Sequence, residues 1–287
     1  MTNLFHSRLR PALIILAMMA LAALVSTGCG RQEQEKKPAP PKPSAQAQPG
    51  LPAPAVTPQA QPVLIVQSGP VVAIIIDDLG MDMAHLDMVL PLGKGLTFAV
   101  MPGLPCSART AGRARQEGHE VIMHLPMQPK GEVKGLGPGA LLTGMSADDL
   151  HKTFLADYAT VPGADGVNNH MGSLLTEDRA AMNALMGVLK EKGLIFIDSR
   201  TTASSVALQA AKDAGVRAAE RAVFLDDSAE PDDINAQFDR MVSLAQKRGA
   251  VVAIGHPRPN TVGVLMERLP ELEKSGIKLV RVSELAR

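Results

Sequence analysis

Six short apolar runs in this chain end in polar side chains of the kinds that bind metals and move protons. Each run is rich in Val, Ile or Leu and stops at a carboxylate, an imidazole or a carboxamide. The residues at these ends are Asp77, Asp78, His124, Asn168, Asn169, His170, Asp198, Asp226, Asp227 and His256. Two imidazoles and one carboxylate with a position left open form a hydrolytic zinc site. The pattern therefore indicates metal-assisted hydrolysis.

The adjacent carboxylates Asp77 and Asp78, followed by Gly80, give the strongest local signal. Of two carboxylates held side by side, one can coordinate a cation while the other accepts a proton, because their environments separate the two pKa values. The alternative is that they only cap the next helix, as a single Asp often does. Two carboxylates in a row favour the functional role.

Three of the seven histidines follow apolar runs on three different segments, namely His124, His170 and His256. A single histidine in such a place is often structural, but three of them with two carboxylates indicate a shared site. The other four histidines are expected to be surface or structural residues.

Two other polar features are expected to have structural roles. Asp226 and Asp227 precede Pro231 and are expected to start a helix rather than to act in catalysis. Cys106 has no histidine-rich surroundings and is expected to be a packed small side chain.

The chain alternates between strand-like and helix-like segments from Val71 onward, and these elements must bring the polar ends together. Runs rich in Val and Ile that lack alternation are typical of strands buried on both faces. The expected strands cover 71–76, 96–100, 120–124, 165–169, 194–198, 222–225, 251–255 and 278–282. The expected helices cover 82–90, 107–117, 146–159, 177–192, 204–213, 232–248 and 261–274. Because ligands bind at the carboxyl ends of parallel strands, the polar residues should meet on one rim.

This succession of seven or eight strand–helix units predicts an α/β fold, either a barrel of parallel strands or a doubly wound sheet. Ser146 with Asp149 three residues later marks a helix start, and a glycine before several strands marks a helix end. The segment 125–145 is rich in Gly and Pro and is expected to form a loop over the rim.

Residues 1–29 have the features of a bacterial export signal. Two arginines precede an apolar stretch at 12–25, and small residues lead into Cys29. The position of Cys29 predicts lipidation, which would anchor the exported chain to a membrane. An uncleaved anchor is the alternative, although the apolar stretch is short for a span of about 20 residues. Either way, the rest of the chain is expected to face the periplasm or the cell exterior.

Residues 30–69 are expected to be a disordered linker, because Pro, Ala and Gln dominate and little apolar surface is available to bury. Residues 70–287 then form one folded domain. The 29 basic and 29 acidic residues balance, which argues against a nucleic-acid partner. Aromatic residues make up only 2% of the chain, which disfavours a long sugar cleft lined by rings.

The folded part resembles the divergent polysaccharide deacetylases, a branch of the polysaccharide deacetylase superfamily. The motifs that carry the resemblance are IIIDDLG at 74–80, GHEVIMHLPMQP at 118–129, GPGALLTGMS at 137–146, GVNNHMGS at 166–173, FIDSRTT at 196–202, FLDD at 224–227 and IGHPRPNT at 254–261. The resemblance implies a distorted (β/α) barrel of the NodB-like type. It also implies a metal-dependent hydrolase of the cell envelope that removes N-acetyl groups from a polysaccharide or cell-wall sugar.

The resemblance implies a role for each of the central residues. Asp77 matches the catalytic base, and Asp78 and His124 match ligands of a divalent ion, first of all Zn²⁺. His256 matches the general acid that protonates the leaving amine. Asp198 stands where a carboxylate commonly orients or tunes a catalytic partner.

One ligand of the ordinary superfamily pattern is missing. That pattern has a second histidine four residues after His124, and Gln128 stands there in this chain. We expect His170, from the next strand, to replace it. The departure leaves a second hypothesis open, in which the barrel is a catalytically weak or inactive module of an envelope lipoprotein that binds carbohydrate or regulates.

Further residues are expected around the substrate. Arg200 could meet a substrate carboxylate or a developing oxyanion, and the two asparagines are explained equally well by bonds in a tight turn. The expected substrate-binding set is Arg200, Asn168, Asn169, Gln128 and Arg258. A glycoside hydrolase that uses Asp77 and Asp198 is a third hypothesis, which the histidines disfavour.

Overall fold

The computed structural model describes residues 69–287. The expected export signal at 1–29, the lipidated Cys29 and the linker up to residue 68 lie outside the described residues. Within residues 69–287, no helix is both long and apolar enough to cross a membrane.

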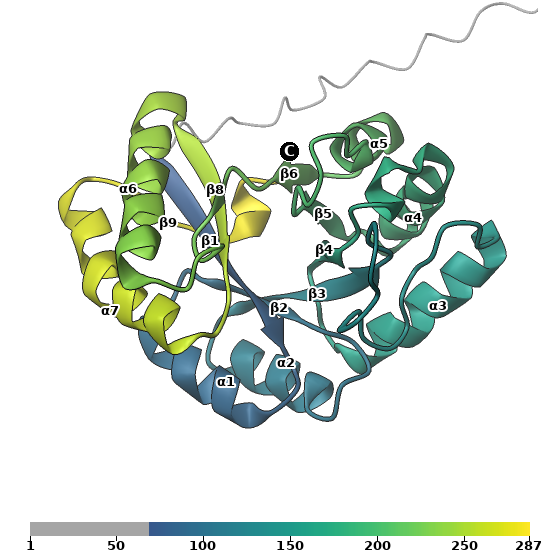
Figure 1. Ribbon diagram of the computed structural model, residues 1–287, viewed down its shortest axis with the longest axis horizontal. Coiled ribbons are helices and arrows are strands. Elements are labelled where there is room, and N and C mark those ends of the chain that lie inside the picture. Colours follow the sequence, from purple (N-terminus) through teal and green to yellow (C-terminus); the bar gives the residue numbers. More distant parts are fainter. Residues whose placement is uncertain (1–68) are drawn as a thin grey trace, which may run out of the picture. The chain divides into compact units, whose positions relative to one another are not determined.

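The strands form one parallel sheet that curls into a half-barrel, in the order β6-β5-β4-β3-β2-β1-β8-β7 (Figure 1). They are β1 (Val71–Leu79), β2 (Thr97–Val100), β3 (Glu120–Met127), β4 (Gly166–Met171), β5 (Ile195–Asp198), β6 (Ala218–Glu220), β7 (Val223–Phe224) and β8 (Ala250–Gly255). A short strand, β9 (Lys278–Leu279), pairs with β1 outside this path. The distorted parallel barrel predicted from the sequence is confirmed as a single domain.

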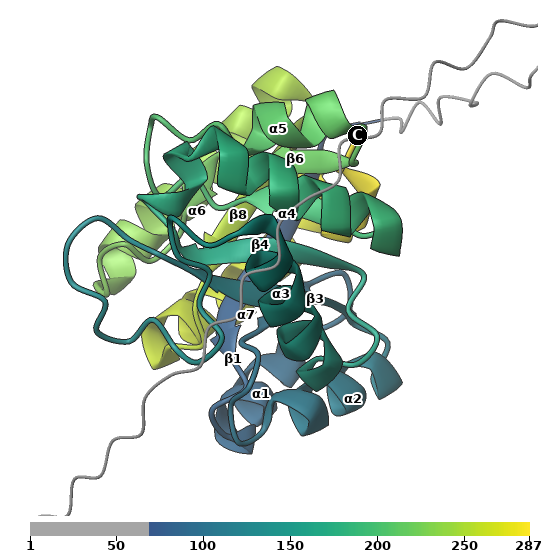
Figure 2. The same ribbon diagram turned by 90° about the vertical axis from the view of Figure 1, so that its right-hand side faces the viewer.

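Helices surround the outer side of the strands (Figures 1 and 2). The α-helices of the described residues are α1 (Met83–Val89), α2 (Ser107–Gln116), α3 (Ala147–Thr160), α4 (Arg179–Lys192), α5 (Ala207–Ala214), α6 (Pro231–Arg248) and α7 (Pro259–Lys274). Three 3₁₀ turns accompany them, η1 (Leu90–Leu92), η2 (Leu175–Glu177) and η3 (Val282–Glu284). Each helix agrees with the sequence prediction within a few residues. Strand β6 was not predicted, because Ala-Ala-Glu has no strand-favouring side chain.

Helix ends follow the expected signals. The Ser146 side chain accepts a hydrogen bond from the backbone N–H of Asp149 and caps α3. Gly193, Gly215 and Gly249 end α4, α5 and α6 in the left-handed conformation, which glycine adopts without steric cost.

The two faces of each strand pack into different apolar clusters. On β1, Ile74 and Ile76 pack with the helices, whereas Ala73 and Ile75 belong to a smaller cluster inside the half-barrel. Because side chains alternate along a strand, the next inward residue is Asp77. The inward face of β1 therefore becomes polar at the carboxyl end of the strand.

The half-barrel is open between β6 and β7, the two ends of the strand order. The chain passes directly from one to the other through Arg221 and Ala222. The backbone N–H of Arg221 donates to the carbonyl oxygen of Asp198, and the backbone N–H of Ala222 donates to the carbonyl oxygen of Val252. This short segment therefore spans the opening, and it places Arg221 there.

Candidate active site

Strand β1 delivers two adjacent carboxylates to the rim because it contains a bulge. The pairing of β1 with β2 shifts register between Ile76 and Leu79, and Asp78 has a left-handed φ of 58°. On a regular strand, Asp77 and Asp78 would point to opposite faces, but here both border the same cavity. Backbone strain of this kind concentrates at functional sites.

The pairing of β3 with β4 brings two histidines together. His124 is level with Asn168, and Pro126 is level with His170. His170 therefore lies two residues further along the rim than His124, and the two rings meet edge to face with their centroids 4.9 Å apart. The expected replacement ligand thus lies beside His124.

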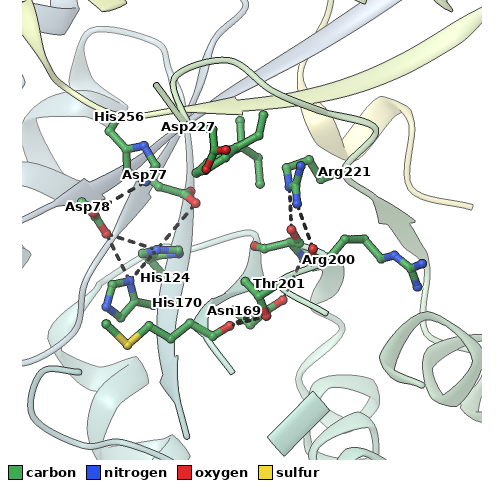
Figure 3. Close-up of a pocket in the computed structure, with 14 residues that line it drawn as sticks. Asp77, Asp78, His124, Asn169, His170, Arg200, Thr201, Arg221, Asp227 and His256 are labelled. Atoms are coloured by element: carbon green, nitrogen blue, oxygen red, sulfur yellow. Dashed lines mark hydrogen bonds and ion pairs between the residues drawn. The ribbon is translucent and has the colours of Figure 1, made fainter. Parts of the chain in front are cut away.

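Three atoms of these side chains form a small triangle (Figure 3). Asp78 Oδ1 lies 3.3 Å from His124 Nε2 and 3.2 Å from His170 Nδ1, and the two nitrogens are 3.1 Å apart. Asp78 Oδ1 is buried and has no hydrogen-bond partner within residues 69–287. These three atoms are arranged as the ligands of one ion would be.

The other nitrogen of each imidazole faces an oxygen that can only accept. His124 Nδ1 lies 2.8 Å from Asn168 Oδ1, and His170 Nε2 lies 3.2 Å from the carbonyl oxygen of Gly135. We therefore assign the proton of each neutral ring to that outer nitrogen. The inner nitrogens then turn their lone pairs towards Asp78, as in histidines that bind metals.

The three donors fit a divalent ion such as Zn²⁺. Two ligand atoms that each lie 2.0–2.1 Å from a tetrahedral zinc ion are about 3.4 Å apart, which is close to the spacings of the triangle. Two nitrogen lone pairs and a carboxylate oxygen so close together also repel one another unless positive charge lies between them. Asp78, His124 and His170 are thus the residues that would hold the ion.

The pKa values of Asp78 and His124 also indicate that positive charge is favourable between these side chains. Burial alone would raise the pKa of Asp78, but the facing side chains of His124 and His170 lower it below its usual range. Burial alone would lower the pKa of His124, but the carboxylates of Asp77 and Asp78 raise it to about 9. A metal ion that bound here would therefore have to displace a proton.

Asn168 connects His124 to the second carboxylate. Its Nδ2 donates to Asp77 Oδ1 at 2.8 Å, so one buried carboxamide positions both side chains. Burial raises the pKa of Asp77, although the charges of His124 and His256 act in the opposite direction. A carboxylate with a raised pKa is suited to accept a proton during catalysis.

His256 follows β8 and faces Asp78 across the rim. Its Nδ1 lies 2.9 Å from Asp226 Oδ1, and its backbone N–H donates to Asp226 Oδ2 at 2.8 Å. Burial alone would lower the pKa of His256, but the hydrogen bond and the charge of Asp226 raise it. His256 Nε2 lies 3.7 Å from Asp78 Oδ2. A protonated His256 therefore presents its remaining N–H to the site.

These side chains border a cavity of about 390 Å³. Its lining residues are Asp77, Asp78, His124, Asn169, His170, Met171, Ser199, Arg200, Thr201, Arg221, Phe224, Asp227, Ile254 and His256. In the described part of the chain, the non-glycine residues with positive φ are Asp78, Met171 and Arg200, and all three border this cavity. Strained strand ends thus build the site.

A family model described as "Divergent polysaccharide deacetylase" matches residues 74–286. The chain belongs to this family. It is 40% identical over 215 residues to an uncharacterised protein of Haemophilus influenzae, covering 75% of this chain and 76% of that one. It is 38% identical over 226 residues to the uncharacterised protein YibQ of Escherichia coli, covering 77% and 70%.

A solved structure has the same fold as this divergent polysaccharide deacetylase. The uncharacterised protein ATU2773 from Agrobacterium tumefaciens matches with a TM-score of 0.73 and 24% identity. The match covers 76% of this chain and 89% of that one, so the fold extends over nearly all of the described domain.

In this divergent deacetylase, Asp198 lies on the wrong face of β5 to border the cavity. Ile195 and Ile197 point into the half-barrel, so Asp198 points to the opposite face. It is fully buried, and its two carboxylate oxygens accept from the backbone N–H of Arg200 and the hydroxyl of Ser205. The expected tuning carboxylate instead fixes the turn after β5.

Gln128 also makes contacts away from the cavity. Its Oε1 accepts from both the backbone N–H and the hydroxyl of Thr143, and its carbonyl oxygen accepts from the N–H groups of Leu174 and Leu175. Gln128 therefore anchors the loop after β3. That loop was expected from residue 125, but β3 continues to Met127.

Of the remaining residues of the expected substrate-binding set, some border the cavity and others do not. Arg200 and Asn169 border the cavity, whereas Asn168 is buried behind it. The guanidinium of Arg200 is turned away from Asp78, His124 and His170 (Figure 3). Arg258 does not border the cavity, and its guanidinium donates to the carbonyl oxygen of Asp226 at 2.7 Å.

Asp226 is a neighbour of the site that the sequence analysis did not recognise. It was expected to start a helix, but α6 begins only at Pro231 and has Glu230 as its N-cap. The signal was present in the strand ends, because β7 and β8 pair with Phe224 level with Ile254. Two residues beyond that pair on each strand, Asp226 meets His256.

Proposed function

We propose that this protein is a metal-dependent amide hydrolase, with Zn²⁺ as its first candidate ion, that removes N-acetyl groups from a polysaccharide or cell-wall sugar of the envelope. The observation that carries the proposal is the triangle of Asp78, His124 and His170 beside a base and an acid. Family membership supports the substrate class, and the donor atoms support the ion.

A bound divalent ion would supply Lewis acidity towards the amide carbonyl and the attacking water. Asp77 accepts the proton of that water at Oδ2, because Asn168 already holds Asp77 Oδ1. The raised pKa of Asp77 favours this transfer, and the buried carboxamide of Asn168 keeps the carboxylate oriented.

His256 donates a proton from Nε2 to the leaving nitrogen as the C–N bond breaks. Its other nitrogen is committed to Asp226, so Nε2 is the atom left for substrate. The hydrogen bond and the charge of Asp226 raise the pKa of His256, which favours the protonated form that a general acid requires. The products are acetate and a free amine.

Particular residues argue against each of the two other hypotheses. Gln128 was the residue that favoured the non-catalytic hypothesis, but His170 offers a third donor atom beside Asp78 and His124, and Gln128 anchors a loop. The glycoside hydrolase hypothesis needed Asp198, whose carboxylate is bonded to Ser205 and does not border the cavity.

We place the protein in the envelope on sequence grounds alone. The export signal and Cys29 support a lipid anchor, and a linker up to residue 69 would let the domain reach material above the membrane. Incorporation of labelled fatty acid into the wild-type chain, and its loss in Cys29→Ala, tests the anchor. Equal labelling of the two chains would exclude lipidation at Cys29.

Acetate release from N-acetylated amino-sugar polymers tests the activity. We expect release from the Zn²⁺-loaded protein, loss on treatment with a chelator, and recovery when Zn²⁺ is returned. Asp77→Asn should abolish release without loss of the ion, whereas Asp165→Asn, an exposed carboxylate outside the cavity, should act like the wild type. A metal-loaded chain that is inactive on every acetylated polymer and small amide would exclude the proposed function.

A further inference from the structure

Arg221 borders the catalytic cavity without an ion-pair partner. Among the site arginines of residues 69–287, Arg200 pairs with Glu220 at 3.5 Å and Arg258 lies 3.9 Å from Asp226. No carboxylate lies within 4.0 Å of the Arg221 guanidinium in the same residues. Burial lowers its pKa, while the more distant charges of Asp198 and other carboxylates act in the opposite direction.

The guanidinium of Arg221 is held in one orientation. Nε donates to the carbonyl oxygen of Ser199 at 2.6 Å, and Nη2 donates to that of Arg200 at 2.8 Å (Figure 3). Its Cζ lies 4.9 Å from the ring centroid of Phe224, a cation–π contact. Nη1 makes no hydrogen bond with any described residue, so its two N–H groups are left for a ligand.

The Phe224 ring separates Arg221 from the proposed general acid. It meets the His256 ring edge to face, with centroids 5.3 Å apart, and has Arg221 as its other neighbour. A group bound at Arg221 would therefore be separated from the reacting amide by about the width of the Phe224 ring. That spacing suits a second substituent of the substrate rather than the acetyl group itself.

The position of Arg221 follows from the opening of the half-barrel. Arg221 is in the segment that joins β6 to β7, and it borders both the catalytic cavity and a second cavity of about 370 Å³ along the opening. Arg200 and Arg248 border the second cavity as well, with Glu220 as its acidic residue. The cationic side chains outnumber the acidic one there, which favours anions.

We propose that Arg221 forms a carboxylate subsite, so that the preferred substrate is an N-acetylated compound that also carries a carboxylate. The subsite deepens the proposed amidase function and rests on it for the identity of the reacting group. A fixed guanidinium with a free nitrogen suits a carboxylate, because charge-assisted bonds to it are strong and directional.

Matched ligands test the subsite by binding, apart from hydrolysis. Calorimetry with the metal-loaded protein would compare N-acetylglucosaminuronic acid with N-acetylglucosamine, and N-acetylalanine with N-acetylalaninamide. Each pair keeps the acetamide and differs in one carboxylate. We expect the acid of at least one pair to bind at least about tenfold more tightly. The pair that shows the preference tells whether the carboxylate belongs to a sugar acid or to an amino acid.

Arg221→Gln should remove the preference for the acid and leave the affinity for its neutral partner within about twofold. Arg217→Gln, which removes a positive charge outside both cavities, should leave the preference intact. If Arg221→Gln fails to fold, arginine side-chain NMR of the wild type decides, since only the acid should shift the Arg221 resonance. Equal binding of acid and neutral partner by the wild type, or an unchanged preference in Arg221→Gln, would overturn the subsite.

The binding and the hydrolysis experiments can contradict the carboxylate subsite and the amidase function independently of each other. A chain that prefers the acids but releases no acetate keeps the subsite and loses the amidase function. A chain that deacetylates acid and neutral amides equally keeps the amidase function and loses the subsite.

Discussion

Each imidazole of the site has one nitrogen committed to a fixed partner and one left for chemistry. Asn168 fixes His124, the carbonyl oxygen of Gly135 fixes His170, and Asp226 fixes His256. These partners differ in charge, and the charge of the partner determines whether the histidine is suited to bind a metal or to donate a proton. Neutral carbonyl partners leave His124 and His170 free to act as ligands, whereas the Asp226 carboxylate favours the protonated form of His256.

Asp226→Asn should slow the reaction without weakening metal binding. The amide still bonds to the His256 ring, but it removes the charge that raises the pKa of His256. The acid form is then lost at lower pH, so the basic limb of the pH–rate profile should move to lower pH. We expect kcat to fall about 100-fold, the range of general acid catalysis. An unchanged pH profile would contradict the role given to Asp226.

Asp157 on α3 makes stability depend on pH, away from the site. Its carboxylate is buried, its Oδ2 has no hydrogen-bond partner among residues 69–287, and burial raises its pKa to about 7. The folded chain therefore binds this proton more tightly than the unfolded chain. The associated stability is present below about pH 4 and is lost as the pH rises towards about 7.

Asp157→Asn should remove this loss. We expect the variant to be more stable than the wild type at about pH 8, by an amount on the order of 2 kcal/mol, and similar to it near pH 4. Urea unfolding at the two pH values measures the difference. A variant that is no more stable than the wild type at the higher pH would show that ionisation of Asp157 does not destabilise the fold.

At the scale of the element, side-chain alternation brings several of the strand-end residues to the cavity. The inward residues Ile75, Ile122 and Val252 share a parity with Asp77, His124 and His256, respectively. Asp198 has the opposite parity to Ile197. The sequence predicted the strands and the rim, but these runs are apolar on both faces, so it did not reveal which face was inward.

Other features depend on geometry that a single sequence does not carry. The bulge at Asp77 and Asp78 brings both carboxylates to one cavity, and strand periodicity alone would have separated them. The pair of Asp226 and His256 depends on the register of β7 with β8. Strand β6 has too weak a sequence pattern to be predicted. The opening between β6 and β7, where Arg221 lies, could therefore not be predicted either.

Gln128 gives a test at the level of the loop after β3. The superfamily pattern suggests that Gln128→His would restore a ligand, but the side chain is turned to Thr143, and the three proposed donors Asp78, His124 and His170 already lie together. We expect Gln128→His to leave Zn²⁺ affinity within about twofold and to speed amide hydrogen exchange around Thr143, since two hydrogen bonds are lost. A clear gain in Zn²⁺ affinity would mean that position 128 can still reach the ion.

At the scale of the molecule, the half-barrel combines a closed side and an open side. Strands β1, β3, β4 and β8 carry the donor and acid residues, and the gap between β6 and β7 carries Arg221. The chemistry therefore has a rigid frame of paired strands, whereas recognition is assigned to the edge where pairing ends. The family assignment extends over the whole of this frame.

Zinc titration of the purified chain and of His170→Ala tests the central claim most directly. Calorimetry should find one ion per wild-type chain, and His170→Ala should lower the affinity at least about 100-fold, because His170 Nδ1 is one of the three donors. Asn169→Ala, a neighbour whose carboxamide contacts only backbone groups, should bind the ion as the wild type does. A wild-type chain that binds no divalent ion, or a His170→Ala chain that binds zinc as tightly as the wild type, would contradict the proposed metal site.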